Sequence, residues 1–277
     1  MLPLRSSADA GSPAGSAHDM VNPEVFQTPV CIEIRDLCVG YGSVRALQSV
    51  SFTAREAGIT AILGSGGAGK SALLRSLNRM NDLIPGARTS GSCRVGGIDV
   101  LDARVDLPWL RRRVGLILQD AAPFALSVSE NVAFGLRLAG CPGSEIEERV
   151  AAALRRVGLW NEVRDRLGDT ALRLSEEQAR RLCIARALAV GPAVLLLDEP
   201  SGALDPVSSA RIEDVIRGLR ADHTVLIATR DPRLAARLSD QTAFLDQGEL
   251  VEIDDTARLF SHPRDPRTER YLTGRFA

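Results

Sequence analysis

The sequence predicts an α/β protein with a mostly parallel central sheet, an N-terminal antiparallel β-subdomain and an inserted α-helical subdomain. Three observations support this fold class. A glycine-rich loop follows a short apolar segment, residues 59–63, and precedes leucines at helical spacing. Residues 193–197 and 224–228 are apolar throughout, which suits central strands covered on both faces. Residues 32–35 and 50–53 alternate apolar and polar side chains, as strands with one wet face do.

Composition places the chain among ordinary globular proteins. Its 277 residues are 45% hydrophobic and 25% charged, enough for one large domain. A net charge of −1 and 4% aromatic residues disfavour a nucleic-acid partner, which needs a basic surface or stacking rings. The five cysteines include no C-x-x-C pair, so we expect a reducing compartment, no disulfides and no cysteine metal site. No apolar run approaches about 18 residues, so we expect no direct membrane span.

Two stretches differ from the rest of the chain in composition or pattern. Residues 1–28 are rich in Ala, Gly, Ser and Pro, and we interpret them as a disordered tail before a domain over residues 29–277. Either Met1 or Met20 is the true start. Residues 121–173 carry helical periodicity without strand signals, which predicts the inserted helical subdomain. We expect a capping box from Ser144 to Glu147 within it.

The chemistry is expected to centre on residues 64–71, which read GSGGAGKS and fit the phosphate-binding pattern G-x-x-x-x-G-K-[ST]. The backbone N–H groups of such a loop, together with the positive end of the following helix, attract phosphate. Lys70, the only lysine of the chain, would reach the β- and γ-phosphates, and the Ser71 hydroxyl would ligate Mg²⁺. The alternative is a glycine-rich turn without a ligand.

Four further side chains have both a functional and a purely structural interpretation. The acids Asp198 and Glu199 end an apolar strand; beside a phosphate loop they would hold Mg²⁺ and activate water, but alone they would be solvated carboxylates. Gln119 follows the strand predicted at 114–118, where it is either a loop residue or a contact to Mg²⁺ or the attacking water. Tyr41 either packs on the sheet or stacks on an adenine, and the phosphate loop favours stacking.

Taken together, residues 31–277 resemble the nucleotide-binding subunits of ABC transporters. The matching motifs occur in the family's order: Tyr41, the loop at 64–71 (Walker A), Gln119 (Q-loop), residues 174–178 (signature position), 197–200 (Walker B and its glutamate) and 201–205 (D-loop). The resemblance implies catalytic roles for Gln119, Glu199 and Arg230, and Mg²⁺ contacts from Ser71, Gln119 and Asp198. It also implies these nucleotide contacts: Tyr41, Gly64, Ser65, Gly66, Gly67, Ala68, Gly69, Lys70, Ser71, Ala72, Ser175, Gln178 and Asp205.

A narrower resemblance is to the ATPases of phosphate importers (PstB type). It rests on residues 77–88, 130–136 and the terminal 274–276. The resemblance implies ATP and Mg²⁺ as cofactors, and two subunits that sandwich two ATP molecules between one P-loop and the other signature. It implies membrane permease subunits as partners, with a second ATPase subunit that is either identical or a paralogue. The expected location is peripheral, on the cytoplasmic face of the plasma membrane.

The sequence departs from the family at elements of closure and turnover. Glu176 and Glu177 replace the two glycines of the signature, and carboxylates about 5 Å from a triphosphate repel it by ~3 kcal/mol at a dielectric of ~20. Ser175 and Gln178 still predict a capping box, so the helix should form. Arg230 stands where the switch histidine is expected and cannot act as both donor and acceptor. One hypothesis is that Arg230 bridges to Glu176 or Glu177 across a dimer.

Three functions therefore compete. The first is an ATPase subunit of a phosphate importer. The second is an ATP-binding subunit with little turnover, in a regulatory or heterodimeric role. The third, a soluble ABC ATPase of nucleic-acid maintenance, is disfavoured because the net charge is −1 and the chain has no long coiled-coil insertion.

Overall fold

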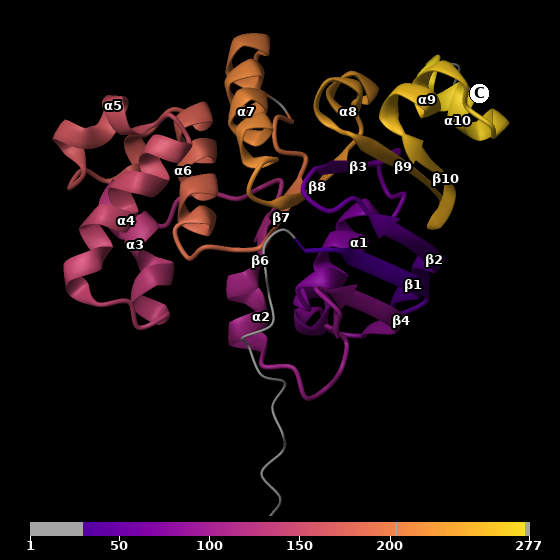
Figure 1. The fold of residues 1–277 in the computed structure, drawn as a ribbon, viewed down its shortest axis with the longest axis horizontal. Helices are drawn as coiled ribbons and strands as arrows, with labels where there is room; N and C mark the ends of the chain where they lie inside the picture. The colour runs from indigo at the N-terminus through magenta and orange to yellow at the C-terminus, as the bar shows by residue number, and fades with distance from the viewer. Residues whose placement is uncertain (1–29, 203, 275–277) are drawn as a thin grey trace, which may run out of the picture.

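The computed structural model describes residues 30–202 and 204–274. The tail expected over residues 1–28, the alternative start at Met20 and positions 275–276 of the narrower resemblance lie outside these described residues. The chain forms two sheets with helices around them (Figure 1). The α/β class predicted from the sequence, with an antiparallel N-terminal sheet and a mostly parallel central sheet, is confirmed.

The smaller sheet is antiparallel and has the strand order β2-β1-β4-β5. Its strands are β1 (Ile32–Tyr41), β2 (Val44–Ala54), β4 (Ala87–Val95) and β5 (Ile98–Asp99). Apolar residues on one face, Ile32 and Ile34 among them, are buried, while neighbours such as Arg35 are exposed. The predicted alternation therefore reflects one face packed on the core and one face in water.

The larger sheet has the order β10-β9-β3-β8-β7-β6, and β10 alone is antiparallel to its neighbour. Its strands are β3 (Ile59–Leu63), β6 (Val114–Ile117), β7 (Val194–Asp198), β8 (Thr224–Thr229), β9 (Gln241–Asp246) and β10 (Glu249–Asp255). Every residue of β3, β7 and β8 is buried. Along β7, Leu196 packs in one core cluster, whereas Leu195 and Leu197 pack in the other. Because both faces are covered, the strand sequence is apolar at successive positions.

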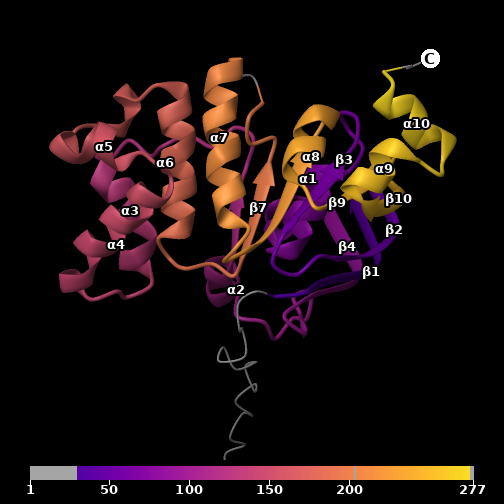
Figure 2. The same ribbon diagram turned by 45° about the horizontal axis from the view of Figure 1, so that its top comes forward.

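A group of helices packs together on one side of the larger sheet (Figure 2). It contains α3 (Val128–Leu138), α4 (Gly143–Arg156), α5 (Trp160–Val163), the 3₁₀ turns η3 (Arg164–Arg166) and η4 (Ala171–Arg173), and α6 (Glu176–Leu188). Helix α6 contacts both α3 and α4, although it lies beyond residue 173. The limits 121–173 for a helical subdomain stay a prediction.

One detail of the helical prediction is wrong. The expected capping box at Ser144 is absent, because α4 already begins at Gly143 after Pro142, and no side chain caps it. Proline at 142 fixes its own φ and allows the first turn to start earlier, which places Ser144 inside the helix. The capping box of this region lies instead at Ser127, which pairs with Glu130 at the start of α3.

The remaining helices lie between the strands or, for the last two, after β10. They are α1 (Lys70–Leu77), the 3₁₀ turn η2 (Met80–Leu83), α2 (Leu107–Arg113), α7 (Pro206–Leu219), α8 (Pro232–Leu238), α9 (Thr256–Ser261) and α10 (Pro266–Leu272). Helix α1 ends at Leu77, so Met80, three residues further on, lies in η2 rather than in that helix. Within the described part of the chain, no helix combines the length and apolar character that crossing a membrane requires. The carboxyl ends of β3, β7 and β8 meet at one edge, which brings the loops that follow them together.

Candidate functional site

The glycine loop between β3 and α1 is shaped by two close backbone approaches. A Cβ at Gly64 would lie 2.3 Å from the carbonyl oxygen of Leu245, and one at Gly69 would lie 2.4 Å from that of Ala46. Gly69 also has a φ of 100°, which favours glycine. At Gly66 and Gly67, in contrast, a Cβ would meet nothing within 4 Å. The two ends of the loop therefore pack against neighbouring backbone. The backbone in its middle stays open to an anionic ligand, as in a phosphate-binding loop.

Lys70 is buried under this loop, with 6% of its surface exposed. Its ammonium donates hydrogen bonds to the carbonyls of Gly64 and Ser65, each at 2.8 Å, and lies 3.9 Å from the Glu199 carboxylate. Burial lowers the pKa of Lys70, while the nearby carboxylates of Glu199 and Asp198 partly offset this effect. The carbonyl contacts hold the ammonium at the first residue of α1, next to the open backbone.

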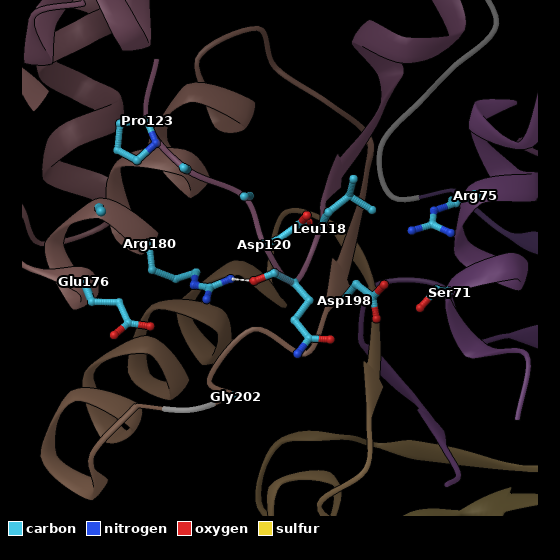
Figure 3. Close-up of a pocket in the computed structure, with 13 residues that line it drawn as sticks. Ser71, Arg75, Leu118, Asp120, Pro123, Glu176, Arg180, Asp198 and Gly202 are labelled. Carbon is cyan, nitrogen blue, oxygen red and sulfur yellow. Dashed lines mark hydrogen bonds between the residues drawn. The ribbon is translucent and has the colours of Figure 1, made fainter. Parts of the chain in front are cut away.

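The three predicted Mg²⁺ contacts line one cleft of about 630 Å³. Ser71 lies at the start of α1, Asp198 ends β7, and Gln119 follows β6. Figure 3 shows Ser71 and Asp198 on neighbouring elements at this cleft, with Arg180 on its other side. Hydroxyl, carboxylate and amide oxygens are ligands that Mg²⁺ accepts alongside phosphate oxygens and water. The residues present therefore fit a magnesium ion held jointly with a nucleotide.

Two arginines in this cleft were not predicted from the sequence. Arg180 of α6 is buried and donates a hydrogen bond to the backbone carbonyl of Gln119. This bond ties the Gln119 backbone to the helical region. Arg75 lines the same cleft from α1. Neither residue belongs to a recognisable sequence pattern, and Arg180 is 61 residues from Gln119, so no sequence signal could have identified them.

Glu199, the predicted general base, is buried among several hydrogen-bond donors and cations. It has a φ of 47° and is 7% exposed. The Thr229 hydroxyl and the Arg230 N–H each donate to one carboxylate oxygen at 3.3 Å. The other oxygen lies 3.2 Å from Arg230 Nε and 3.9 Å from Lys70 Nζ. Arg230 stands where the resemblance places the switch histidine, and its ion pair with Glu199 of the same chain was not predicted from the sequence.

The signature position shows that Glu176 and Glu177 face different directions. Ser175 caps α6 and forms the predicted capping box with Gln178, which is confirmed. Glu176 is exposed and lines the cleft. Glu177 is buried, and Arg181 donates a hydrogen bond to its carboxylate at 2.9 Å. The expectation that both acids approach a phosphate is therefore wrong for Glu177, whose carboxylate is paired with the Arg181 guanidinium.

Four other predicted nucleotide contacts already have a structural role. The Tyr41 hydroxyl donates to the Asn81 side chain at 2.5 Å, and the ring is partly buried against the core, as its packing alternative predicts. Asp205 caps α7 by accepting hydrogen bonds from the N–H groups of Val207 and Ser208. The Ser208 side chain, followed by these N–H groups, lowers the pKa of Asp205. Ala72 is buried in α1, like Ala68 in the loop. Contacts of these residues with a nucleotide stay predictions.

The glycine loop, the acids after β7 and the helical region define a P-loop domain of the ABC type. The profile of the ABC transporter family matches residues 47–202, more than half of the chain. The chain therefore belongs to the ABC transporter family as an ATP-binding domain. Membership implies ATP binding, typically with Mg²⁺, and ATPase activity in general.

The chain is also similar to a solved structure, that of a bacterial Atm1-family ABC exporter with ATP bound. The identity is 27% and the TM-score 0.74, and the match covers 91% of this chain. It covers 43% of the exporter chain, so this chain spans less than half the length of that protein.

Proposed function

We propose that this chain is the ATP-binding and ATP-hydrolysing subunit of an ABC importer. The observation that carries the proposal is the convergence of Lys70, Asp198 and Glu199 at the edge where β3, β7 and β8 end. The open backbone at Gly66 and Gly67 would bind the phosphates, and Lys70 would exchange loop carbonyls for β- and γ-phosphate oxygens. Glu199 would accept a proton from the attacking water.

Magnesium fits the same arrangement. Ser71 and Asp198 would hold it, with Gln119 at the third position of the cleft. A bound Mg²⁺ supplies positive charge that neutralises the phosphate oxygens during transfer. The protein's own contribution is to orient these oxygens on rigid elements, since Ser71 lies on a helix and Asp198 on a buried strand.

The finer proposal is the import of inorganic phosphate. It is supported by the sequence resemblance over residues 77–88 and 130–136. The partners would be membrane permease subunits and a second ATPase subunit, identical or paralogous, at the cytoplasmic face of the plasma membrane. The similarity to the exporter covers 43% of the exporter chain and reflects the ATPase fold that the two proteins share. Substrate selectivity would lie in the permease rather than in this chain.

A second candidate, an ATP-binding subunit with little turnover, is favoured by two observations. The Glu199 carboxylate is engaged by Arg230 and Lys70, which restrains it from contacting water. Glu176 places a carboxylate at the signature position, where it would repel a phosphate. The rate of ATP hydrolysis at saturating Mg-ATP separates the two candidates.

Binding of a non-hydrolysable ATP analogue with Mg²⁺ tests the nucleotide assignment. Lys70→Ala removes a charge-assisted contact, so we expect a loss of affinity of about tenfold to a hundredfold, or ~1.5–3 kcal/mol. Ser76→Ala is the matched control, because Ser76 is buried in the same helix, where its hydroxyl donates to the Ala72 carbonyl and accepts from the Asn81 side chain. Unchanged affinity in Lys70→Ala would contradict the proposal.

A further inference from the structure

The C-terminal helix α10 reaches the catalytic side of the sheet through a single tyrosine. The Tyr271 hydroxyl donates a hydrogen bond to the backbone carbonyl of Arg230 at 2.8 Å. Tyr271 is 7% exposed, and its ring packs against Phe244 of β9 with 4.9 Å between ring centroids. The ring is therefore fixed in a core cluster, and its hydroxyl has a defined direction.

The same residue that Tyr271 holds contacts Glu199 through two groups. Arg230 donates its backbone N–H to one carboxylate oxygen at 3.3 Å and places Nε 3.2 Å from the other. The preceding Thr229 hydroxyl donates to the same carboxylate and accepts the N–H of Asp231 at 3.1 Å. Residues 229–231 thus surround one side of Glu199, and Tyr271 holds this segment in place through the Arg230 carbonyl.

The Arg230 side chain alone would hold segment 229–231 only weakly against Glu199. It is 58% exposed, so solvent reaches the guanidinium and screens its side of the ion pair with the buried Glu199, and the long side chain loses freedom when it is held there. The position of Arg230 therefore depends on its backbone. Of the contacts to that backbone, the one from Tyr271 comes from a helix 41 residues further along the chain.

We propose that Tyr271 is a positioning residue for Glu199: its hydroxyl fixes the Arg230 carbonyl and thereby aims the Arg230 N–H and Nε at the carboxylate. This inference rests on the proposed function, in which Glu199 is the general base. It extends the catalytic apparatus to α10, which lies outside the residues 47–202 that match the family profile. Burial, followed by the charge of Glu199, raises the pKa of Tyr271 to about 12, so the hydroxyl keeps its proton as a donor at neutral pH.

Tyr271→Phe tests the inference in the full-length chain, because it removes the hydroxyl and keeps the ring on Phe244. We expect kcat for ATP hydrolysis to fall about threefold to tenfold, the effect of one misdirected hydrogen bond. KM and the affinity for the Mg²⁺ complex of a non-hydrolysable analogue should stay within twofold. The matched control is Thr273→Val, which removes a hydroxyl of the same region that donates to the Glu269 and Arg270 carbonyls of α10 and should leave kcat unchanged.

A second comparison separates positioning of Glu199 from a general loosening of the fold. In a Glu199→Gln background the residual hydrolysis should be insensitive to Tyr271→Phe, because the group being positioned is gone. An unchanged kcat in Tyr271→Phe, an equal loss in Thr273→Val, or the same loss in the Glu199→Gln background would each overturn the inference. A wild-type chain that hydrolyses no ATP would instead contradict the proposed function, and the inference with it.

Discussion

Glu199 lies at a position where a carboxylate needs partners. It is 7% exposed, and an unpaired charge at such depth costs several kcal/mol. Lys70 and Arg230 supply two cations, and Thr229 and the Arg230 backbone supply neutral donors. These contacts give the buried carboxylate hydrogen-bond and ion-pair partners, but they also compete with a water molecule for the same oxygens. In the proposed role of general base, Glu199 would therefore need phosphate binding to draw Lys70 and Arg230 away from its oxygens.

A residue away from this site, His223, should make stability depend on pH. Its ring nitrogen Nδ1 lies 3.0 Å from the Pro192 carbonyl oxygen. Burial lowers the pKa of His223 from 6.5, while Pro192 and Asp222 raise it by smaller amounts and the charge of Arg156 lowers it. Because the folded pKa is below the unfolded one, the unfolded chain binds more protons between the two values. The contribution of His223 is therefore complete above about pH 6.5 and is lost as pH falls through the folded pKa.

Urea unfolding of wild type and His223→Gln between pH 7 and pH 5 measures this effect. Glutamine keeps an amide donor for the Pro192 carbonyl but does not titrate. We expect the unfolding free energy of wild type to fall more steeply with decreasing pH than that of the variant. Parallel slopes for the two proteins would show that His223 is not responsible.

At the scale of elements, the start of α6 combines a standard cap with an unusual pair of acids. Successive residues of an α-helix point about 100° apart, so Glu176 faces the cleft while Glu177 faces the core. Arg181, one turn later, pairs with Glu177 and also donates to Glu162 at 2.8 Å. The helix therefore accommodates a side chain where the family has glycine by adding a buried counter-charge.

Removing that counter-charge should be costly. In Arg181→Met the Glu177 carboxylate stays buried without its main partner, and we expect a loss of about 3–5 kcal/mol in unfolding free energy. Adding Glu177→Gly should recover part of the loss, since the stranded charge is gone. Arg173→Met is the control, because Arg173 is exposed, and it should change stability by less than about 0.5 kcal/mol. Equal stability of Arg181→Met and Arg173→Met would contradict the buried pair.

At the scale of the whole molecule, the fold could be predicted because several levels of the sequence agree. The fully apolar run at β7 predicts burial on both faces, and the glycine loop predicts a strand before it and a helix after it. The start of α4 and the 3₁₀ turn at Met80 could not be predicted, because both depend on how the chain packs beyond the local pattern.

The candidate site was predictable only in part, for a related reason. Lys70, Asp198 and Glu199 follow glycine-loop and strand-end patterns that are visible in one sequence. The contacts of Arg180 with Gln119 and of Tyr271 with Arg230 join residues 61 and 41 positions apart. No local pattern encodes such contacts, because they depend on how strands and helices that are distant in the sequence pack against one another.

We expect two copies of the chain to form a dimer around Mg-ATP. If two copies close on Mg-ATP, Glu199→Gln should trap the nucleotide, and light scattering should report twice the mass of the monomer. Adding Glu176→Gly removes a carboxylate that would face a phosphate, so the dimer should form at protein concentrations at least tenfold lower. A chain that stays monomeric with saturating Mg-ATP in both variants would contradict a homodimer and favour a paralogous partner.

We propose that this chain hydrolyses ATP at Lys70 and Glu199. Phosphate release by the full-length chain at saturating Mg-ATP measures this activity, with Glu199→Gln assayed alongside and analogue binding as the check on folding. We expect steady turnover in wild type and a rate about 10²–10⁴-fold lower in the variant, the usual contribution of a general base, with nucleotide affinity retained. Equal rates in the two proteins, or no phosphate release above background in wild type, would contradict the claim.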